Sequence, residues 1–220
     1  MTSPRPTAIT GFVLAGGRSS RMGQDKAQLR WKEGTLLTHA VDRLAQVCPS
    51  VWICTSHPPA DPSLTRASGY LPDAAEDAGP LGGIVAALES SSTEWNLLLA
   101  VDLPLVPVAV LAALAAQAEA ARHACVLAVG NGRPQPLCGL YHRRLAAGLR
   151  VCLEQGTLKV MQALEQAGGS PGLFQPMAGD TAAAGWWRNL NTREDWQAAQ
   201  QLAAKGPKED DSAAAAHRLS

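Results

Sequence analysis

The stretch LAGGRSSRMGQDKA, Leu14–Ala27, decides how this chain is interpreted, because it continues directly from the apolar run ITGFVLA, Ile9–Ala15, whose last two residues it includes. An apolar run that ends in paired glycines is typical of a buried strand that turns into a loop. The loop holds three glycines, two arginines and a lysine within fourteen residues. Glycine lets backbone N–H groups approach an anion, arginine grips phosphate oxygens through two parallel bonds, and lysine supplies a point charge. The stretch therefore predicts a site for a phosphate-bearing ligand.

Two better-known phosphate motifs are excluded by their spacing. A Walker loop needs a lysine directly after its last glycine, and here Gln24 follows Gly23. A dinucleotide fingerprint, G-x-G-x-x-G, does not match the residues from Gly16 to Arg21. A glycine-rich turn with solvated charges explains the loop equally well on physical grounds alone, so the later segments have to decide.

Composition predicts one soluble domain without a global affinity for polyanions. The 220 residues carry 19 Lys plus Arg and 19 Asp plus Glu, which argues against nucleic acid and membrane partners. No apolar run approaches the about 20 residues of a membrane span, and we expect a cytoplasmic protein. The five cysteines are scattered and never spaced C-x-x-C, which indicates reduced thiols packed in the interior: Cys48, Cys54, Cys125, Cys138 and Cys152.

Strands are expected to alternate with helices along residues 1–204, and residues 205–220 are expected to form a flexible C-terminal tail. This order predicts a three-layer α/β/α sandwich with a mainly parallel central sheet, whose ligands bind beyond the carboxyl ends of the strands. Thr192 and Asp195 are spaced as a capping box for the last helix. The strands are expected at 8–15, 51–55, 96–101, 124–130 and 135–141, and the helices at 36–47, 79–90, 106–121, 143–155, 157–167 and 192–205.

The pattern L-A-G-G-x-S-x-R-M-G-x-D-K in the opening stretch resembles the molybdopterin nucleotidyltransferase family, and within it the molybdenum cofactor guanylyltransferases. Related sugar-phosphate nucleotidyltransferases usually carry glycine where this chain has Ser19. Molybdopterin cytidylyltransferases usually read L-A-A-G, so Gly16 and the pair Asp25-Lys26 favour guanylyl transfer. The resemblance implies a Rossmann-like nucleotidyltransferase fold that transfers GMP from GTP to molybdenum-molybdopterin and releases pyrophosphate.

Four later segments match the same family in order, so the resemblance spans residues 8 to about 204. Asp73 precedes GPLGGI, Gly79–Ile84; NLLLAV is followed by the D-x-P residues Asp102–Pro104; then come QPLCGLY, Gln135–Tyr141, and NLNT, Asn189–Thr192. From the residues alone, a carboxylate at the end of a buried strand is costly without a cation, and magnesium is commonly held by carboxylates and substrate phosphates. The alternative to a metal ligand is that Asp102 caps the turn or helix that follows it.

The resemblance assigns roles to individual positions. The implied catalytic residues are Arg21, Lys26 and Asp102, with Mg²⁺ on Asp102. The implied nucleotide-binding residues are Leu14, Ala15, Gly16, Gly17, Lys26, Asp73, Gly79, Gly83 and Asp102. The implied contacts to the pterin substrate are Gln135, Asn189 and Asn191. Partners implied by the family are GTP, molybdenum-molybdopterin, other proteins of molybdenum cofactor biosynthesis and apo-molybdoenzymes.

The chain departs from the family pattern in two places. Arg193 stands where proline is common, within a first helical turn. At the end of the second strand some members place an asparagine against the nucleotide, whereas this chain has Cys54, Thr55 and Ser56. Of all the implied properties, the preference for guanine is the one that this departure weakens most. Three alternatives stay open: a cytidylyltransferase, a sugar-phosphate nucleotidyltransferase, and a nucleotide-binding carrier of the pterin without catalysis.

Overall fold

The protein is described from a computed structural model, which covers residues 8–16, 25–56, 64, 66–75, 77–177 and 185–205. A seven-stranded sheet forms its centre, with the strand order β5-β4-β1-β6-β8-β7-β9. The strands are β1 (Ile9–Leu14), β4 (Ser50–Cys54), β5 (Gly69–Leu71), β6 (Trp95–Ala100), β7 (Cys125–Gly130), β8 (Arg133–His142) and β9 (Gly172–Phe174). The predicted 205–220 tail lies outside the described residues except for Lys205.

Strand direction confirms the mainly parallel sheet, with β8 as the exception. β1 pairs in parallel with β4 on one side and with β6 on the other. β8 runs antiparallel to both β6 and β7. From β1 the chain moves first toward β4 and later crosses to β6 on the opposite side, so the connections diverge at β1. This divergence opens a crevice at the carboxyl ends of the strands, where α/β sheets of this kind bind ligands.

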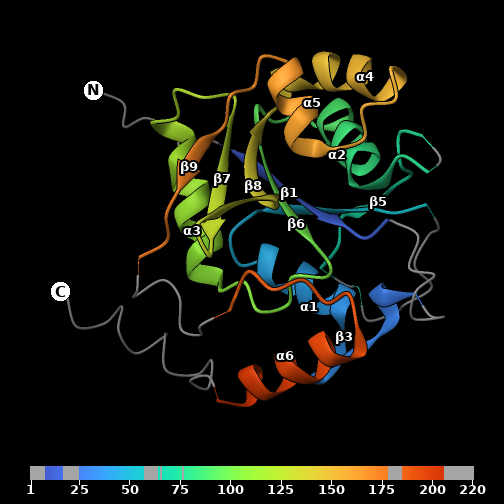
Figure 1. The fold of residues 1–220 in the computed structure, drawn as a ribbon, viewed down its shortest axis with the longest axis vertical. Coiled ribbons are helices and arrows are strands. Elements are labelled where there is room, and N and C mark those ends of the chain that lie inside the picture. The colour runs from blue at the N-terminus through green and yellow to red at the C-terminus, as the bar shows by residue number, and fades with distance from the viewer. Residues whose placement is uncertain are drawn as a thin grey trace.

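Helices cover both faces of the sheet, as the three-layer prediction requires (Figure 1). One apolar cluster, the lower cluster, joins the sheet to the helices on one face, and a second, the upper cluster, joins it to those on the other. The helices of the lower cluster are α1 (Leu36–Leu44) and α6 (Arg193–Lys205), drawn below the sheet, and α3 (Val108–Ala116), drawn at its left. The upper ones are α2 (Gly79–Ser90), α4 (Ala146–Glu154) and α5 (Val160–Gln166).

Several short elements were not predicted. The hairpin of β2 (Arg30–Trp31) and β3 (Gly34–Thr35), together with β5 and β9, are two or three residues long, too short for a period to register. The helix expected over 106–121 begins after Pro107, which is its N-cap, and ends at Ala116 before the 3₁₀ turn η3 (Gln117–Glu119). Two further 3₁₀ turns are η2 (Lys26–Gln28) and η4 (Arg143–Leu145).

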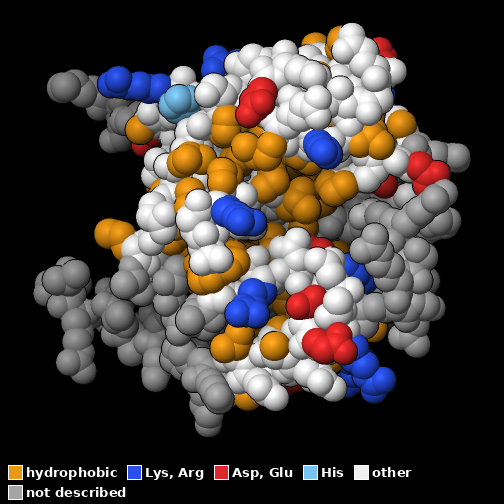
Figure 2. Space-filling model, viewed as in Figure 1, with side chains coloured by type: hydrophobic (Ala, Val, Ile, Leu, Met, Phe, Trp, Pro, Cys, Tyr) orange, Lys and Arg blue, Asp and Glu red, His pale blue; other side chains and the backbone are white. Residues whose placement is uncertain are grey.

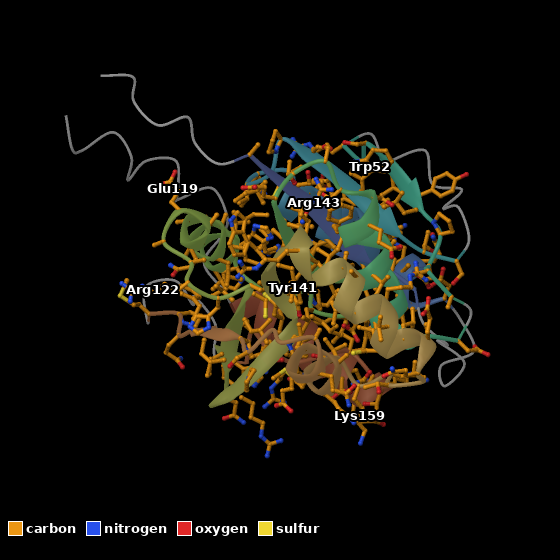
Figure 3. The ribbon with its side chains drawn as sticks, turned by 90° about the horizontal axis from the view of Figure 1, so that it is seen from above. Trp52, Glu119, Arg122, Tyr141, Arg143 and Lys159 are labelled. Carbon is orange, nitrogen blue, oxygen red and sulfur yellow. The ribbon has the colours of Figure 1, made fainter. Side chains whose placement is uncertain are left out.

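The interior confirms the expected packing of the cysteines. All five are free and buried. Tyr141 is also fully buried, and its hydroxyl donates a hydrogen bond to the Pro136 carbonyl at 2.6 Å. Viewed from above, Tyr141 lies near the middle of the molecule, whereas Glu119, Arg122 and Lys159 stand at its margin (Figure 3). Among the described helices, none is both long and apolar enough to cross a membrane.

Strand β6 provides a test of the layered core. Leu97 and Leu98 are both 0% exposed and belong to the lower and upper clusters, respectively. Leu97→Ala and Leu98→Ala should each lower the free energy of unfolding by about 2–5 kcal/mol, since each leaves a cavity in a different layer. Leu173→Ala is the control, because Leu173 is 59% exposed, and its change should stay within about 0.5 kcal/mol. Urea denaturation measures all three; a small loss at either Leu97 or Leu98 would contradict the two-sided core.

Candidate active site

A cavity of about 190 Å³ lies where β1 and β6 end. Its walls come from five separate parts of the chain: the end of β1, the turn that begins η2, the first turn of α2, the end of β6 with the residues that follow it, and β8. The lining residues are Leu14, Ala15, Gly16, Asp25, Lys26, Pro80, Ala100, Val101, Asp102 and Leu137. The cavity thus occupies the edge of the sheet that its topology predicts.

Lys26 and Asp102 meet in this cavity. The Lys26 ammonium lies 4.0 Å from Oδ2 of Asp102, and the two side chains are 20% and 18% exposed. Their meeting follows from the parallel pairing of β1 with β6, in which Leu14 stands beside Ala100, so that the residues following both strands share one edge. A cation and an anion from positions far apart in the sequence therefore face one another across a concave surface.

The carboxylate of Asp102 is only partly compensated by its surroundings. Burial raises its pKa, while the charge of Lys26 and a backbone hydrogen bond oppose that rise without cancelling it. Its Oδ1 atom is buried and has no hydrogen-bond partner among the described residues. A buried carboxylate oxygen with no donor fits a site for a hard cation, which prefers oxygen ligands.

The segment of the chain that precedes α6 runs alongside Asp102. The Leu190 N–H donates to the backbone carbonyl of Asp102 at 2.9 Å. The next residue, Asn191, accepts a hydrogen bond from the Lys26 ammonium on its Oδ1 at 3.0 Å. Asn189, half-buried, lies two residues earlier. The structure thus brings the NLNT segment to Lys26 and Asp102.

Asp73 lies on the α2 side of the same edge, between two glycines. A Cβ on Gly16 would overlap its carboxylate, and a Cβ on Gly83 would lie 3.4 Å from Oδ1. The Ser56 hydroxyl donates to Oδ2 of Asp73 at 3.1 Å. Burial raises the pKa of Asp73, and the Ser56 bond partly offsets that rise. Its Oδ1 atom is buried without a hydrogen-bond partner in the described part of the chain.

The first turn of α2 is left without a side-chain cap. Its N-cap residue is Ala78, which offers no acceptor to the first N–H groups, and Gly79 adopts a φ of 58°. That left-handed conformation favours glycine over residues with a Cβ. Pro80, which follows, lines the cavity. The GPLGG segment therefore places the uncapped first turn of α2 at the rim of the site.

Gln135 is not brought to the other predicted residues. Its side-chain amide donates to the carbonyls of Gly130 at 3.3 Å and Arg133 at 3.2 Å, within the turn that joins β7 to β8. Leu137, two residues along the same strand, lines the cavity instead. Two other predicted residues, Gly17 and Arg21, lie outside the described residues.

Five residues of the cavity wall were not predicted from the sequence. Asp25 belonged to the quoted motif, and its carboxylate accepts from the Ala27 N–H at 3.0 Å, which caps the 3₁₀ turn that carries Lys26. Pro80 and Leu137 likewise stood inside quoted motifs, so position alone was the available signal. Ala100 and Val101 end the quoted run NLLLAV and are buried, and their side chains carry no group that marks them as lining residues.

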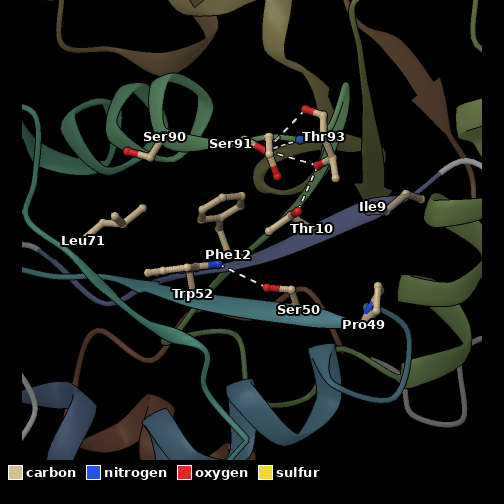
Figure 4. A pocket seen from close by; sticks show the side chains of 11 residues that line it. Ile9, Thr10, Phe12, Pro49, Ser50, Trp52, Leu71, Ser90, Ser91 and Thr93 are labelled. Atoms are coloured by element: carbon tan, nitrogen blue, oxygen red, sulfur yellow. Dashed lines mark hydrogen bonds between the residues drawn. The ribbon is translucent and has the colours of Figure 1, made fainter.

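A second cavity, of about 220 Å³, lies away from Lys26 and Asp102 at the opposite edge of the sheet (Figure 4). Aromatic and aliphatic side chains line it together with hydroxyls, and Trp52 donates from its indole to Ser50 at 3.2 Å. Its lining residues are Ile9, Thr10, Phe12, Pro49, Ser50, Trp52, Leu71, Ser90, Ser91, Ser92 and Thr93. Since none of these carries a charge, this cavity does not fit a triphosphate.

Comparison with known proteins agrees with the geometry. The family model described as the MobA-like NTP transferase domain matches residues 11–168, more than half of the chain. The chain belongs to this family. It is therefore a nucleotidyltransferase, in accord with a cavity lined by lysine and aspartate.

Individual relatives cover nearly the whole chain. A protein of Synechococcus elongatus named probable molybdenum cofactor guanylyltransferase is 35% identical over 197 residues, 87% of this chain and 98% of the relative. A Bacillus mycoides protein of the same name is 30% identical over 202 residues, 87% of this chain and 95% of the relative. The family resemblance read from the motifs is thus confirmed.

Solved structures confirm the fold. Molybdopterin-guanine dinucleotide biosynthesis protein A from Archaeoglobus fulgidus superposes with a TM-score of 0.71 at 21% identity, covering 89% of this chain and 99% of that one. A CMP:2-keto-3-deoxy-manno-octonic acid synthetase complexed with CTP superposes with a TM-score of 0.66 at 16% identity, covering 90% and 99%. At these identities the likeness shows the nucleotidyltransferase fold alone.

The raised pKa of Asp73 predicts a stability effect with a defined sign. Because the folded state raises this pKa, ionisation of Asp73 lowers stability as the pH rises above the ordinary carboxyl value of about 3.9. Asp73→Asn removes the buried charge and keeps an oxygen for Ser56, so the variant should be more stable than wild type at pH 8. The difference should shrink as the pH falls below about 4.

Urea denaturation of both proteins at the two pH values measures this difference. Asp42→Asn is the matched control, since Asp42 is 56% exposed and pairs with Arg66 at 3.7 Å. It should give no stabilisation at pH 8. An Asp73→Asn protein less stable than wild type at pH 8 would show that the ionised carboxylate is favoured by the fold.

Proposed function

We propose that this chain transfers GMP from GTP to molybdenum-molybdopterin and releases pyrophosphate. The observation that carries the proposal is the pairing of the Lys26 ammonium with the Asp102 carboxylate in a cavity at the ends of β1 and β6. Relatives at 30–35% identity over 87% of the chain are named probable molybdenum cofactor guanylyltransferases. Together these favour GTP and the molybdenum-bearing pterin as substrates.

The reaction requires the protein to position the two substrates and to neutralise charge on the phosphates, and it does not require covalent catalysis. A terminal phosphate oxygen of the pterin attacks the α-phosphorus of GTP, a new P–O bond forms there, and the bond to the β-phosphate oxygen breaks so that pyrophosphate leaves. The reaction needs no side-chain nucleophile. The Cys54 thiol, packed near Gly83, is unsuited to that role, because burial and the charge of Asp73 raise its pKa to about 12.

Lys26 would stabilise the negative charge that develops on the triphosphate as pyrophosphate departs. Its ammonium already stands in the cavity and is oriented there by contacts from two other segments, so little reorganisation is needed during the reaction. Arg21, by the family resemblance, adds a second cation from the same loop. Backbone N–H groups around Gly16 and Gly17 are suited to the close approach of phosphates.

Asp102 would hold a magnesium ion. Its buried, unpartnered Oδ1 and its burial-raised pKa fit a hard divalent cation, since one or two carboxylates plus substrate phosphates commonly hold magnesium. When bound, magnesium neutralises charge on the phosphate oxygens. The protein would supply the Asp102 carboxylate, with the Lys26 ammonium 4.0 Å from its Oδ2.

The nucleoside would lie on the α2 side of the cavity, against Asp73. Gly16 and Gly83 allow that carboxylate to lie against the backbone at this edge, because a Cβ at Gly16 would overlap it. The unpartnered Oδ1 of Asp73 can accept a hydrogen bond from a ribose hydroxyl or from the N–H groups of guanine. Leu14, Ala15 and Gly79 contribute the surrounding wall and the helix start.

The pterin would approach from the β8 side. Leu137 gives that wall an apolar surface, and we keep Asn189 and Gln135, which stands two residues before Leu137 on β8, as proposed pterin contacts. On the face drawn in Figure 2, hydrophobic side chains gather in the middle, over β7 and β8 of Figure 1, with lysine and arginine side chains around them. Such a surface suits a planar ring system that carries a phosphate.

Substitution of the paired charges tests the chemistry. Lys26→Ala and Asp102→Ala should each reduce guanylyl transfer by about 100-fold or more, because each removes charge stabilisation in a preorganised site. Circular dichroism and thermal unfolding should remain those of a folded protein. Lys159→Ala and Asp42→Ala remove the same charges from exposed positions and should transfer GMP normally. Near-normal turnover by Lys26→Ala or Asp102→Ala would refute the corresponding role.

Nucleotide preference tests the substrate assignment. Purified protein with Mg²⁺ and authentic molybdenum-molybdopterin should release pyrophosphate with GTP at least about tenfold faster than with CTP, since a site that hydrogen-bonds one base leaves its polar groups unpaired with another. Higher turnover with CTP, or with a sugar phosphate in place of the pterin, would assign the chain to another nucleotidyltransferase activity. Stoichiometric GTP binding without turnover would instead indicate a carrier.

A further inference from the structure

We propose that Asn191 is a positioning residue for Lys26: the last segment of the chain supplies the acceptor that holds the lysine ammonium beside Asp102. This inference rests on the proposed function for its catalytic meaning. It also changes the assignment of Asn191, which the family resemblance places among contacts to the pterin. The proposal concerns a contact between two side chains of this chain.

The contact itself is direct. The Lys26 ammonium donates to Oδ1 of Asn191 at 3.0 Å, whereas its distance to Oδ2 of Asp102 is 4.0 Å. At 3.0 Å the amide oxygen is within hydrogen-bond range, whereas the carboxylate at 4.0 Å attracts the ammonium without fixing its direction. A lysine side chain has a flexible four-carbon stem, so an acceptor at its tip determines where the charge stands.

The backbone that carries Asn191 is fixed from both sides. On one side, the buried Leu190 donates its N–H to the carbonyl of Asp102 at 2.9 Å. On the other, Oδ2 of Asp195 accepts from the N–H groups of Asn191 at 3.0 Å and Thr192 at 2.9 Å. The Asp195 N–H in turn bonds to the Thr192 hydroxyl at 3.1 Å, which completes the predicted capping box. Asn191 therefore stands in a short span with little backbone freedom.

The helix after this span is anchored to the region that carries Lys26. Trp196 of α6 packs edge-on against Trp31, with ring centroids 5.4 Å apart. Trp31 is buried and belongs to the β2–β3 hairpin, which begins two residues after η2. The same packing thus holds together the turn that presents Lys26 and the segment that presents Asn191.

This arrangement lies partly outside the matched family domain. The family model ends at residue 168, whereas Asn191 and α6 follow residue 185. Because the amide oxygen of Asn191 is already engaged by Lys26, its first effect is on the position of the lysine rather than on the pterin. Loss of Asn191 should therefore alter Lys26 even when no acceptor substrate is present.

Lysine labelling in the substrate-free protein tests the contact. Under limiting acetylating reagent, with quantification by mass spectrometry, Asn191→Ala should raise the labelling rate of Lys26 at least about threefold relative to exposed Lys159 in the same sample. Asn191→Asp keeps an oxygen acceptor and should restore protection. Asn189→Ala, which changes the neighbouring asparagine of the motif, should leave the Lys26 rate unchanged. Equal Lys26 labelling in wild type and Asn191→Ala would overturn the proposal.

A double-mutant cycle then tests the consequence for catalysis. Asn191→Ala should lower kcat about tenfold with little change in KM for molybdenum-molybdopterin, because a misplaced lysine weakens transition-state stabilisation. In a Lys26→Met background the same substitution should have almost no further effect on kcat. Additive effects, or a selective rise in KM for the pterin, would overturn the positioning role. If even wild type transfers no GMP while Lys26 labelling still depends on Asn191, the contact stands and the proposed function fails.

Discussion

The site depends on one carboxylate that the protein buries without fully neutralising. Strand β6 is buried on both faces. Asp102 follows two residues after its last residue, Ala100, and lines the cavity. Lys26 lies near enough to lower the pKa of that carboxyl group but not near enough to offset the rise caused by burial. A charge held in this condition favours a further cation, and we propose that it binds at Oδ1, which has no hydrogen-bond partner among the described residues. The other contacts at this edge of the sheet hold Asp102 and Lys26 in place.

Topology explains how these groups come together. Because β1 and β6 are parallel neighbours while the chain visits β4 and β5 between them, the loops after both strands open onto one edge. Asp73 reaches the same edge by following β5 and preceding α2. Its carboxylate then fits beside Gly16 and Gly83, two positions where a Cβ would crowd it. Segments that are 165 residues apart, at Lys26 and Asn191, meet there as well.

The sequence predicts the long strands well because they are continuous apolar runs, and it predicts α1 well because its apolar residues recur on one helical face. It does not predict β2, β3, β5 or β9, since strands of two or three residues form only where a neighbour pairs with them. At the site, the order of motifs predicts which residues share an edge, but not which atoms touch. The bond from Ser56 to Asp73 and the use of the Gln135 amide within its own hairpin depend on side-chain directions that only the assembled sheet determines.

Two carboxylates at one edge, Asp73 and Asp102, each keep a buried oxygen without a hydrogen bond, and burial raises the pKa of both. Elsewhere in the described structure acidic side chains are treated differently: Glu89 is held by Arg150, and Asp195 accepts backbone N–H groups. The fold therefore concentrates unfavourable electrostatic free energy at the edge where we propose that the nucleotide binds. A nucleotide that brought hydrogen-bond donors to one carboxylate and a metal ion to the other would relieve both. On this proposal, stability is exchanged for affinity at these two carboxylates.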